Sequence, residues 1–168
     1  MINQKLFVFE FSSGGGFNQV DIPPSLFCEG YAMLRTIIAD FKKLGFQIST
    51  LLDFRINFLS QYLETGKIKL VRKNDDYIKV YTDCLNECTY CFIIAPEFSS
   101  HLYNLTKIAK DNGKIILSID LGGIVLGAHK LETYKFFMVN NASTPKTYHI
   151  PFKENNFDLQ FVLQNLTS

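Results

Sequence analysis

KLFVFEFSSGGG, residues 5–16, is the stretch that decides the fold, because a mostly apolar run leads into two serines and three consecutive glycines. The apolar run has the length and composition of a buried β-strand. Glycine lacks a Cβ atom, so the loop at 12–16 leaves room for a ligand or another backbone segment to come close. Ligands of open α/β sheets bind beyond the carboxyl ends of the strands, and this loop is therefore predicted to border a binding site.

Helical and extended patterns alternate along the chain, which predicts a parallel sheet with right-handed crossovers. The run YCFIIA, residues 90–95, is apolar throughout, as expected of a central strand covered on both faces. Residues 67–72 instead alternate apolar and basic side chains, as at an exposed edge. The predicted strands are 5–11, 46–52, 67–72, 90–95 and 114–118, and the predicted helices are 25–44, 55–65, 75–86, 99–111, 121–127 and 130–140.

Several residues in the sequence predict where helices and strands begin or end. Ser25 follows two prolines and is predicted to cap the first helix, which Gly45 is predicted to end. Ser99 or Ser100 is predicted to cap the helix after the strand at 90–95. Asp53 ends the second strand, where capping of the next turn is favoured over ligand binding. Glu97 fits a binding site and a helix cap equally well.

The composition excludes several classes of protein. The chain has 168 residues, 47% hydrophobic and 20% charged, with a net charge of +1, so nothing indicates a nucleic-acid-binding surface. No apolar run reaches membrane-spanning length, and no signal-peptide pattern opens the chain. We therefore expect a cytoplasmic protein with no membrane or nucleic-acid partner and with reduced thiols.

The strand ends predict where small molecules bind. The loop after the first strand and the turn after the fourth should meet at one edge of the parallel sheet. The glycines lack the G-x-G-x-x-G spacing of a dinucleotide site, and the helix starts too far downstream for one. The candidate substrate-binding residues are Ser12, Ser13, Gly14, Gly15, Gly16 and Glu97.

Three cysteines form the pattern C-x3-C-x2-C at Cys84, Cys88 and Cys91. This is the spacing with which radical S-adenosylmethionine enzymes hold an iron–sulfur cluster. The context disagrees, because Cys91 falls inside the apolar strand and Cys84 near the end of a helix, where cysteine acts as a small hydrophobe. An iron–sulfur protein is kept as a rival class, but unligated, unbridged thiols and no metal site are predicted.

The order of the motifs resembles that of the ATP-grasp ligases. The glycine loop is followed by a Pro-Pro-Ser helix containing Glu29-Gly30 and 32–35 (AMLR), then by Ala95-Pro96-Glu97 after an apolar strand. Residues 129–133 (HKLET) and 144–147 (TPKT) come later. The resemblance covers about residues 5–147 and is greatest to the archaeal-type group that includes tyramine–glutamate ligase.

The resemblance implies a fold and a division into domains. Residues 1–118 would be a Rossmann-like pre-ATP-grasp domain with a parallel sheet, and 119–168 would be the helical beginning of a truncated ATP-grasp domain. Lys130 matches the lysine that approaches the nucleotide, although His129 stands where the family usually has aspartate. The family's lysine–proline strand, phosphate loop and magnesium ligands do not follow, so we expect a fragment, one half of a split gene or a degenerate homologue.

The implied function is the N-terminal part of an ATP-dependent carboxylate–amine ligase that works through an acyl phosphate. The complete enzyme would use ATP and Mg²⁺ with a carboxylate and an amine as substrates. This chain would carry no catalytic residue and bind no cofactor by itself, because the groups that stabilise phosphoryl transfer lie elsewhere. Its expected partner is the missing C-terminal half or a separate subunit, and homodimerisation is left open. The alternative is a non-catalytic small-molecule-binding or regulatory module.

Overall fold

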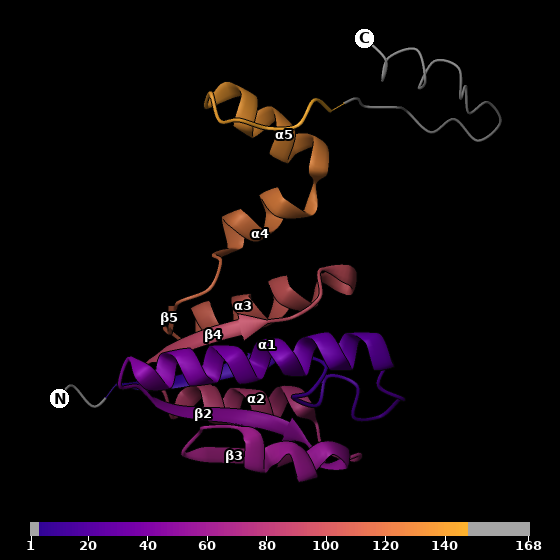
Figure 1. Cartoon of the computed structure of the whole chain (residues 1–168), viewed down its shortest axis with the longest axis vertical. Helices are drawn as coiled ribbons and strands as arrows, with labels where there is room; N and C mark the ends of the chain where they lie inside the picture. The colour runs from indigo at the N-terminus through magenta and orange to yellow at the C-terminus, as the bar shows by residue number, and fades with distance from the viewer. Residues whose placement is uncertain (1–3, 148–168) are drawn as a thin grey trace. The chain divides into compact units, whose positions relative to one another are not determined.

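The computed structural model describes residues 4–147, and its centre is a five-stranded parallel sheet (Figure 1). The strands lie in the order β3-β2-β1-β4-β5, so the strand order reverses between β1 and β4. The sheet confirms the predicted α/β class with a Rossmann-like parallel sheet. The strands are β1 (Lys5–Glu10), β2 (Gln47–Asp53), β3 (Lys67–Val71), β4 (Tyr90–Ile94) and β5 (Ile115–Ile116).

Strand β1 lies in the middle of the sheet and is paired on both sides. Leu6 is in register with Ile48 of β2 and with Tyr90 of β4. Alternate side chains of the strand point to opposite faces, and both faces are covered, which explains why its residues are apolar without alternation. Strand β3 occupies an edge, as its alternating basic residues predicted.

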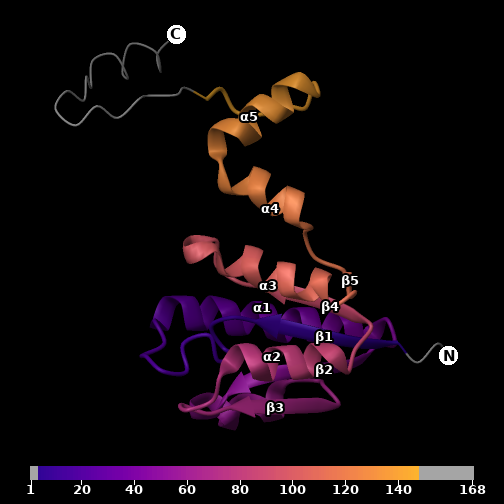
Figure 2. The same ribbon diagram turned by 180° about the vertical axis from the view of Figure 1, so that it is seen from behind.

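Helices cover both faces of the sheet (Figures 1 and 2). Helix α1 (Pro24–Lys43) buries Leu34 and Ile38 in the same cluster as Leu6 and Val8. The second cluster contains residues of α2 (Tyr77–Asn86) and α3 (His101–Asp111) together with the other face of the strands. There the buried ring of Tyr81 lies edge-on to Phe7 and Phe9, with centroids 5.4 and 4.9 Å apart. These two clusters give the sheet a hydrophobic core on each side.

The helix ends confirm some predicted caps and correct others. Helix α1 begins at Pro24 after Pro23, one residue before the predicted cap Ser25, because proline at the first helical position has its φ already set for a helix. Gly45 follows the helix with a φ of +87°, as predicted for its stop. Ser99 and Ser100 lie in the left-handed region, and Ser100 precedes α3 without a side-chain capping bond. The predicted side-chain cap of α3 is therefore wrong.

The remaining elements are short. The segment η1 (Phe54–Tyr62) is 3₁₀-helical and interrupted by a non-helical Ile56. Helices α4 (Leu121–Ala128) and α5 (Lys130–Val139) follow the sheet. The chain divides into two compact units between Val125 and Leu126, while the predicted boundary between 118 and 119 stays a prediction. Across residues 4–147, no helix combines the length and hydropathy needed to cross a membrane.

Three of the four cysteines belong to the core. Cys84, Cys88 and Cys91 are buried, whereas Cys28 is exposed on α1. Burial raises the pKa of the Cys84 thiol to about 11 and that of Cys91 to about 12, since a thiolate is poorly solvated inside the protein. Both thiols therefore remain protonated and unreactive near neutral pH.

We expect one thiol per folded chain to react rapidly with a disulfide reagent such as Ellman's reagent. The reactive thiol is Cys28, and the buried cysteines should react only on unfolding. Cys28→Ser should remove the fast phase, and all the remaining thiols should react in denaturant. A fast phase that persists in Cys28→Ser would contradict this burial pattern.

Candidate functional site

A cavity of about 270 Å³ lies where β1 and β4 end. These two neighbouring strands flank the point at which the strand order reverses, which is the usual ligand position in an open α/β sheet. We call it the switch-point cavity. Its polar lining comes from Glu10, Ser12, Glu29 and Glu97, and its other lining residues are Leu26, Gly30, Met33, Ile94, Ala95 and Pro96.

Glu10, the last residue of β1, is a buried carboxylate in the lining of this cavity. Only 2% of the surface of Glu10 is exposed to solvent. The Ser12 amide donates to Oε1 at 2.8 Å, and the Ser13 amide and hydroxyl donate to Oε2 at 2.7 and 2.5 Å. Donors of this kind hold a carboxyl group in a single orientation.

Helix α1 approaches this carboxylate through Gly30. A Cβ atom at position 30 would lie 2.5 Å from the carboxyl carbon and Oε1 of Glu10. Only glycine leaves room for the helix backbone beside the carboxylate. The neighbouring Glu29 also lines the cavity.

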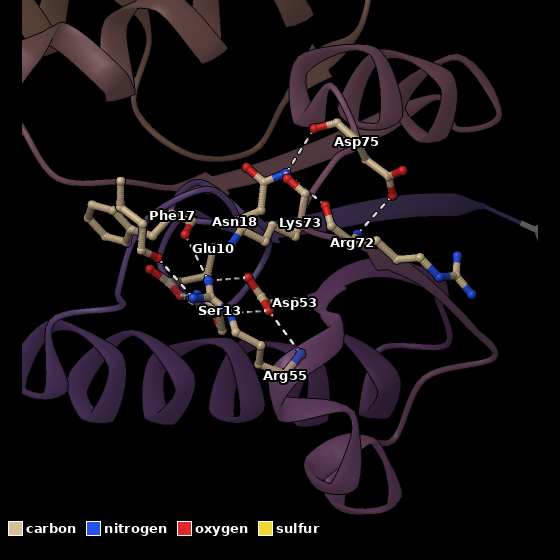
Figure 3. Close-up of polar contacts among 10 residues, drawn as sticks. Glu10, Ser13, Phe17, Asn18, Asp53, Arg55, Arg72, Lys73 and Asp75 are labelled. Atoms are coloured by element: carbon tan, nitrogen blue, oxygen red, sulfur yellow. Dashed lines mark hydrogen bonds and ion pairs between the residues drawn. The ribbon is translucent and has the colours of Figure 1, made fainter.

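The loop after β1 is anchored on one side by Asp53 and Arg55 (Figure 3). Arg55 binds both carboxylate oxygens of Asp53, with Nε 2.9 Å from Oδ1 and Nη2 2.7 Å from Oδ2. The same guanidinium donates to the carbonyl oxygens of Phe17 and Val20. The hydrogen bond from Arg55 to Asp53 raises the pKa of the guanidinium. Asp53 also accepts from the Arg55 amide, which confirms its predicted capping role.

Asn18 anchors the same loop on its other side. Its amide Nδ2 donates to the carbonyl oxygens of Arg72 at 2.9 Å and Asp75 at 2.8 Å, just after β3 (Figure 3). Asn18 is buried, so these bonds replace the water that its amide would otherwise bind. The loop beside the switch-point cavity is therefore held by two neighbouring segments of the sheet edge.

The three glycines of the loop pack against the protein itself. A Cβ atom would lie 2.4 Å from the Glu10 carbonyl oxygen at Gly14, 2.6 Å from a Val71 methyl carbon at Gly15, and 2.5 Å from the Phe11 ring at Gly16. Gly15 also has a φ of +100°. These contacts account for the absence of side chains without any ligand, and none of the three glycines lines the cavity.

The structure brings together two of the predicted substrate-binding positions. Ser12 and Glu97 line the same cavity, as expected of residues that follow neighbouring parallel strands. Ser13 is buried beneath it, bonded to Glu10. Glu97 is exposed and makes no capping bond, so its predicted capping role is wrong. The binding roles themselves stay predictions.

Sequence comparison identifies relatives of the chain. Residues 46–120 match the family model of the pre ATP-grasp 3 domain. The chain is 30% identical over 150 residues to the tyramine–L-glutamate ligase of Methanocaldococcus jannaschii, covering 88% of this chain and 47% of the relative. The enzyme of the same name from Methanocaldococcus fervens is 29% identical over 144 residues, covering 83% of this chain and 47% of that relative.

Structure comparison agrees with the sequence relatives. A crystal structure described as an ATP-grasp superfamily protein, from Archaeoglobus fulgidus, superposes with a TM-score of 0.63 at 26% identity, covering 82% of this chain and 40% of that one. Residues 46–120 thus match a pre-ATP-grasp domain, and the chain is similar in sequence and structure to ATP-grasp superfamily proteins. It spans about half the length of the ligases that it matches.

A larger cavity, about 480 Å³, lies at the opposite, amino ends of the strands. It is lined by Lys5, Lys42 and Lys67, among others, but Lys67 forms an ion pair with Glu87. Lys42 lies in the last turn of α1, where cations complement the helix dipole. This cavity lies at the end of the sheet opposite to the usual ligand position, so we assign the ligand site to the switch-point cavity.

Two further parts of the chain were candidates for cofactor chemistry. Lys130, the predicted nucleotide lysine, is exposed at the first position of α5, and its role stays a prediction. No three His, Cys, Asp or Glu side chains within residues 4–147 are placed to hold a metal ion. The cysteine pattern therefore has no support in the described part of the chain, because its thiols are buried in the core.

The residues that sequence analysis missed are Glu10, Glu29 and Gly30 as parts of one cavity. One signal was present for Glu10, since it is an acidic residue inside an otherwise apolar strand. A charge in such a place needs a reason, because buried carboxylates are costly without partners. Gly30 in the interior of a helix was a second signal, since glycine destabilises a helix unless close packing requires it.

Proposed function

We propose that this chain is the N-terminal part of an ATP-dependent carboxylate–amine ligase and that its switch-point cavity contributes to substrate binding. The observation that carries the proposal is the position of the cavity at the reversal of strand order, with acidic groups from β1, α1 and the end of β4 around it. The names of the two ligases that it resembles support the reaction class.

The role of this chain in such a reaction is to bind and orient. Glu10 is held rigidly by Ser12 and Ser13, so the cavity wall is preorganised, and fixed groups save the entropy of positioning a substrate. ATP and Mg²⁺ would supply the phosphoryl group and charge neutralisation that form an acyl phosphate. The described residues provide no cluster of magnesium ligands, so no step of phosphoryl transfer is assigned to them.

A chimeric enzyme tests this proposal. The matching N-terminal portion of the Methanocaldococcus jannaschii ligase is replaced by this chain, and ADP release is measured with tyramine and L-glutamate. We expect ADP release that requires both substrates. Glu97→Gln should raise the KM of one substrate by about tenfold, equivalent to about 1.4 kcal/mol, with the KM of ATP unchanged.

The control is Glu64→Gln, since Glu64 is an exposed carboxylate that does not line the switch-point cavity. It should leave all KM values unchanged. A folded chimera that releases no ADP with both substrates and ATP present would contradict the ligase proposal and favour the non-catalytic binding module instead.

A further inference from the structure

We infer that the switch-point cavity binds the ammonium group of the amine substrate and not the carboxylate of the acid. The inference states which substrate the cavity binds. Its relevance to catalysis rests on the proposed ligase function. Ligand binding to the chain can nevertheless be measured without turnover, so the two proposals can fail separately.

The charge of the cavity lining is the first reason. Among residues 4–147, the ionisable side chains that line it are the carboxylates of Glu10, Glu29 and Glu97, and no lysine, arginine or histidine of this part of the chain does so. An anionic ligand would therefore meet only like charges, whereas an ammonium group would meet opposite ones. Because a cavity with low-dielectric walls strengthens such interactions, the lining selects a cation.

The hydrogen bonding of the buried Glu10 is the second reason. Glu10 is only 2% exposed, and no ion pair within residues 4–147 involves its carboxylate. Three hydrogen-bond donors reach it, from Ser12 and Ser13, while a carboxylate offers about four acceptor sites. The remaining acceptor capacity of this carboxylate borders the cavity, where an ammonium group could donate to it and a carboxylate could not.

The apolar walls of the cavity indicate the chemistry of the rest of the amine substrate. Leu26 and Met33 of α1 form one apolar wall, and Ile94, Ala95 and Pro96 at the end of β4 form another. Small-molecule sites combine such apolar walls with a few polar groups that fix orientation. With a volume of about 270 Å³, the cavity suits a small primary amine with an apolar or aromatic body.

The test is a titration of the 168-residue chain with three probes, in which binding is measured by NMR or calorimetry. Tyramine carries an ammonium group, tyrosol has a hydroxyl in its place, and L-glutamate carries two carboxylates. We expect tyramine to bind at least about tenfold more tightly than tyrosol, because only tyramine supplies the cation. L-Glutamate should not displace tyramine from the cavity.

Charge-removing variants locate the interaction. Glu29→Gln and Glu97→Gln should each weaken tyramine binding by about tenfold and change tyrosol binding by less than about twofold. Glu64→Gln, outside the cavity, should change neither. Circular dichroism of each variant shows whether the chain is folded, and both tested side chains are exposed, so folding should be unaffected.

Several results would overturn the inference. They are equal affinity for tyramine and tyrosol, L-glutamate binding that depends on Glu29 or Glu97, and no tyramine binding at about 10 mM, where millimolar affinity would be visible. If the chimera releases ADP but tyramine does not bind here, the ligase proposal stands and this inference fails. If tyramine binds as expected and the chimera is inactive, the ligase proposal fails alone.

Discussion

Gly15→Ala is expected to destabilise the folded chain by about 3 to 4 kcal/mol, the sum of backbone strain and overpacking. Position 15 has a φ of +100°, which a side chain tolerates poorly. The new Cβ would also lie 2.6 Å from a methyl carbon of Val71, which is fully buried in β3. The free energy of unfolding from urea denaturation, monitored by circular dichroism, measures the effect.

Gly113→Ala is the matched control for backbone strain alone. Gly113 has a φ of +67°, but no atom lies within 4 Å of the Cβ position. We expect a loss of about 1 to 2 kcal/mol there, the cost of the left-handed conformation. Equal losses at positions 15 and 113 would show that packing against Val71 contributes nothing.

Gly30→Ala is expected to lower stability by about 2 to 3 kcal/mol, even though alanine favours helices by about 1 kcal/mol over glycine. The added methyl group would displace the Glu10 carboxylate from its donors in Ser12 and Ser13. Urea denaturation gives the loss of stability. Tyramine binding in the variant that remains folded should weaken as well, because Glu10 and Gly30 both line the cavity.

Gly127→Ala provides the control within another helix. No atom lies within 4 Å of the Cβ position of Gly127 in α4. The change should therefore be neutral or stabilising by up to about 1 kcal/mol. If Gly30→Ala stabilised the chain as Gly127→Ala is expected to, the close approach of α1 to Glu10 would be wrong.

The packing around the glycine loop gives its glycines a structural role, while their predicted substrate-binding role stays a prediction. From sequence, the three glycines indicated space for a substrate, and they do lie at the carboxyl end of β1. The structure fills that space with Phe9, Val71 and Phe11 instead. A bulky residue at position 15 should therefore act first on stability, and any effect on substrate binding should follow from movement of Ser12.

The sequence alone determined the architecture of this protein. The continuous apolar runs of β1 and β4, the alternating edge strand β3 and the intervening amphipathic helices are local patterns, and each predicts its element without knowledge of the others. Gly45 and Asp53 also marked element ends correctly, since the φ of glycine and the short carboxylate of aspartate act within a few residues. The order of motifs further indicated the superfamily that the comparisons confirm.

Only the tertiary structure decided which residues share a site. Glu10, Glu29 and Glu97 are separated along the chain and meet because β1 and β4 are neighbours and α1 crosses over the end of β1. The anchors of the loop, Asn18 and Arg55, likewise act on residues that are distant in sequence. Contacts of this kind depend on strand order and on atomic packing, and periodicity along a chain carries no information about either.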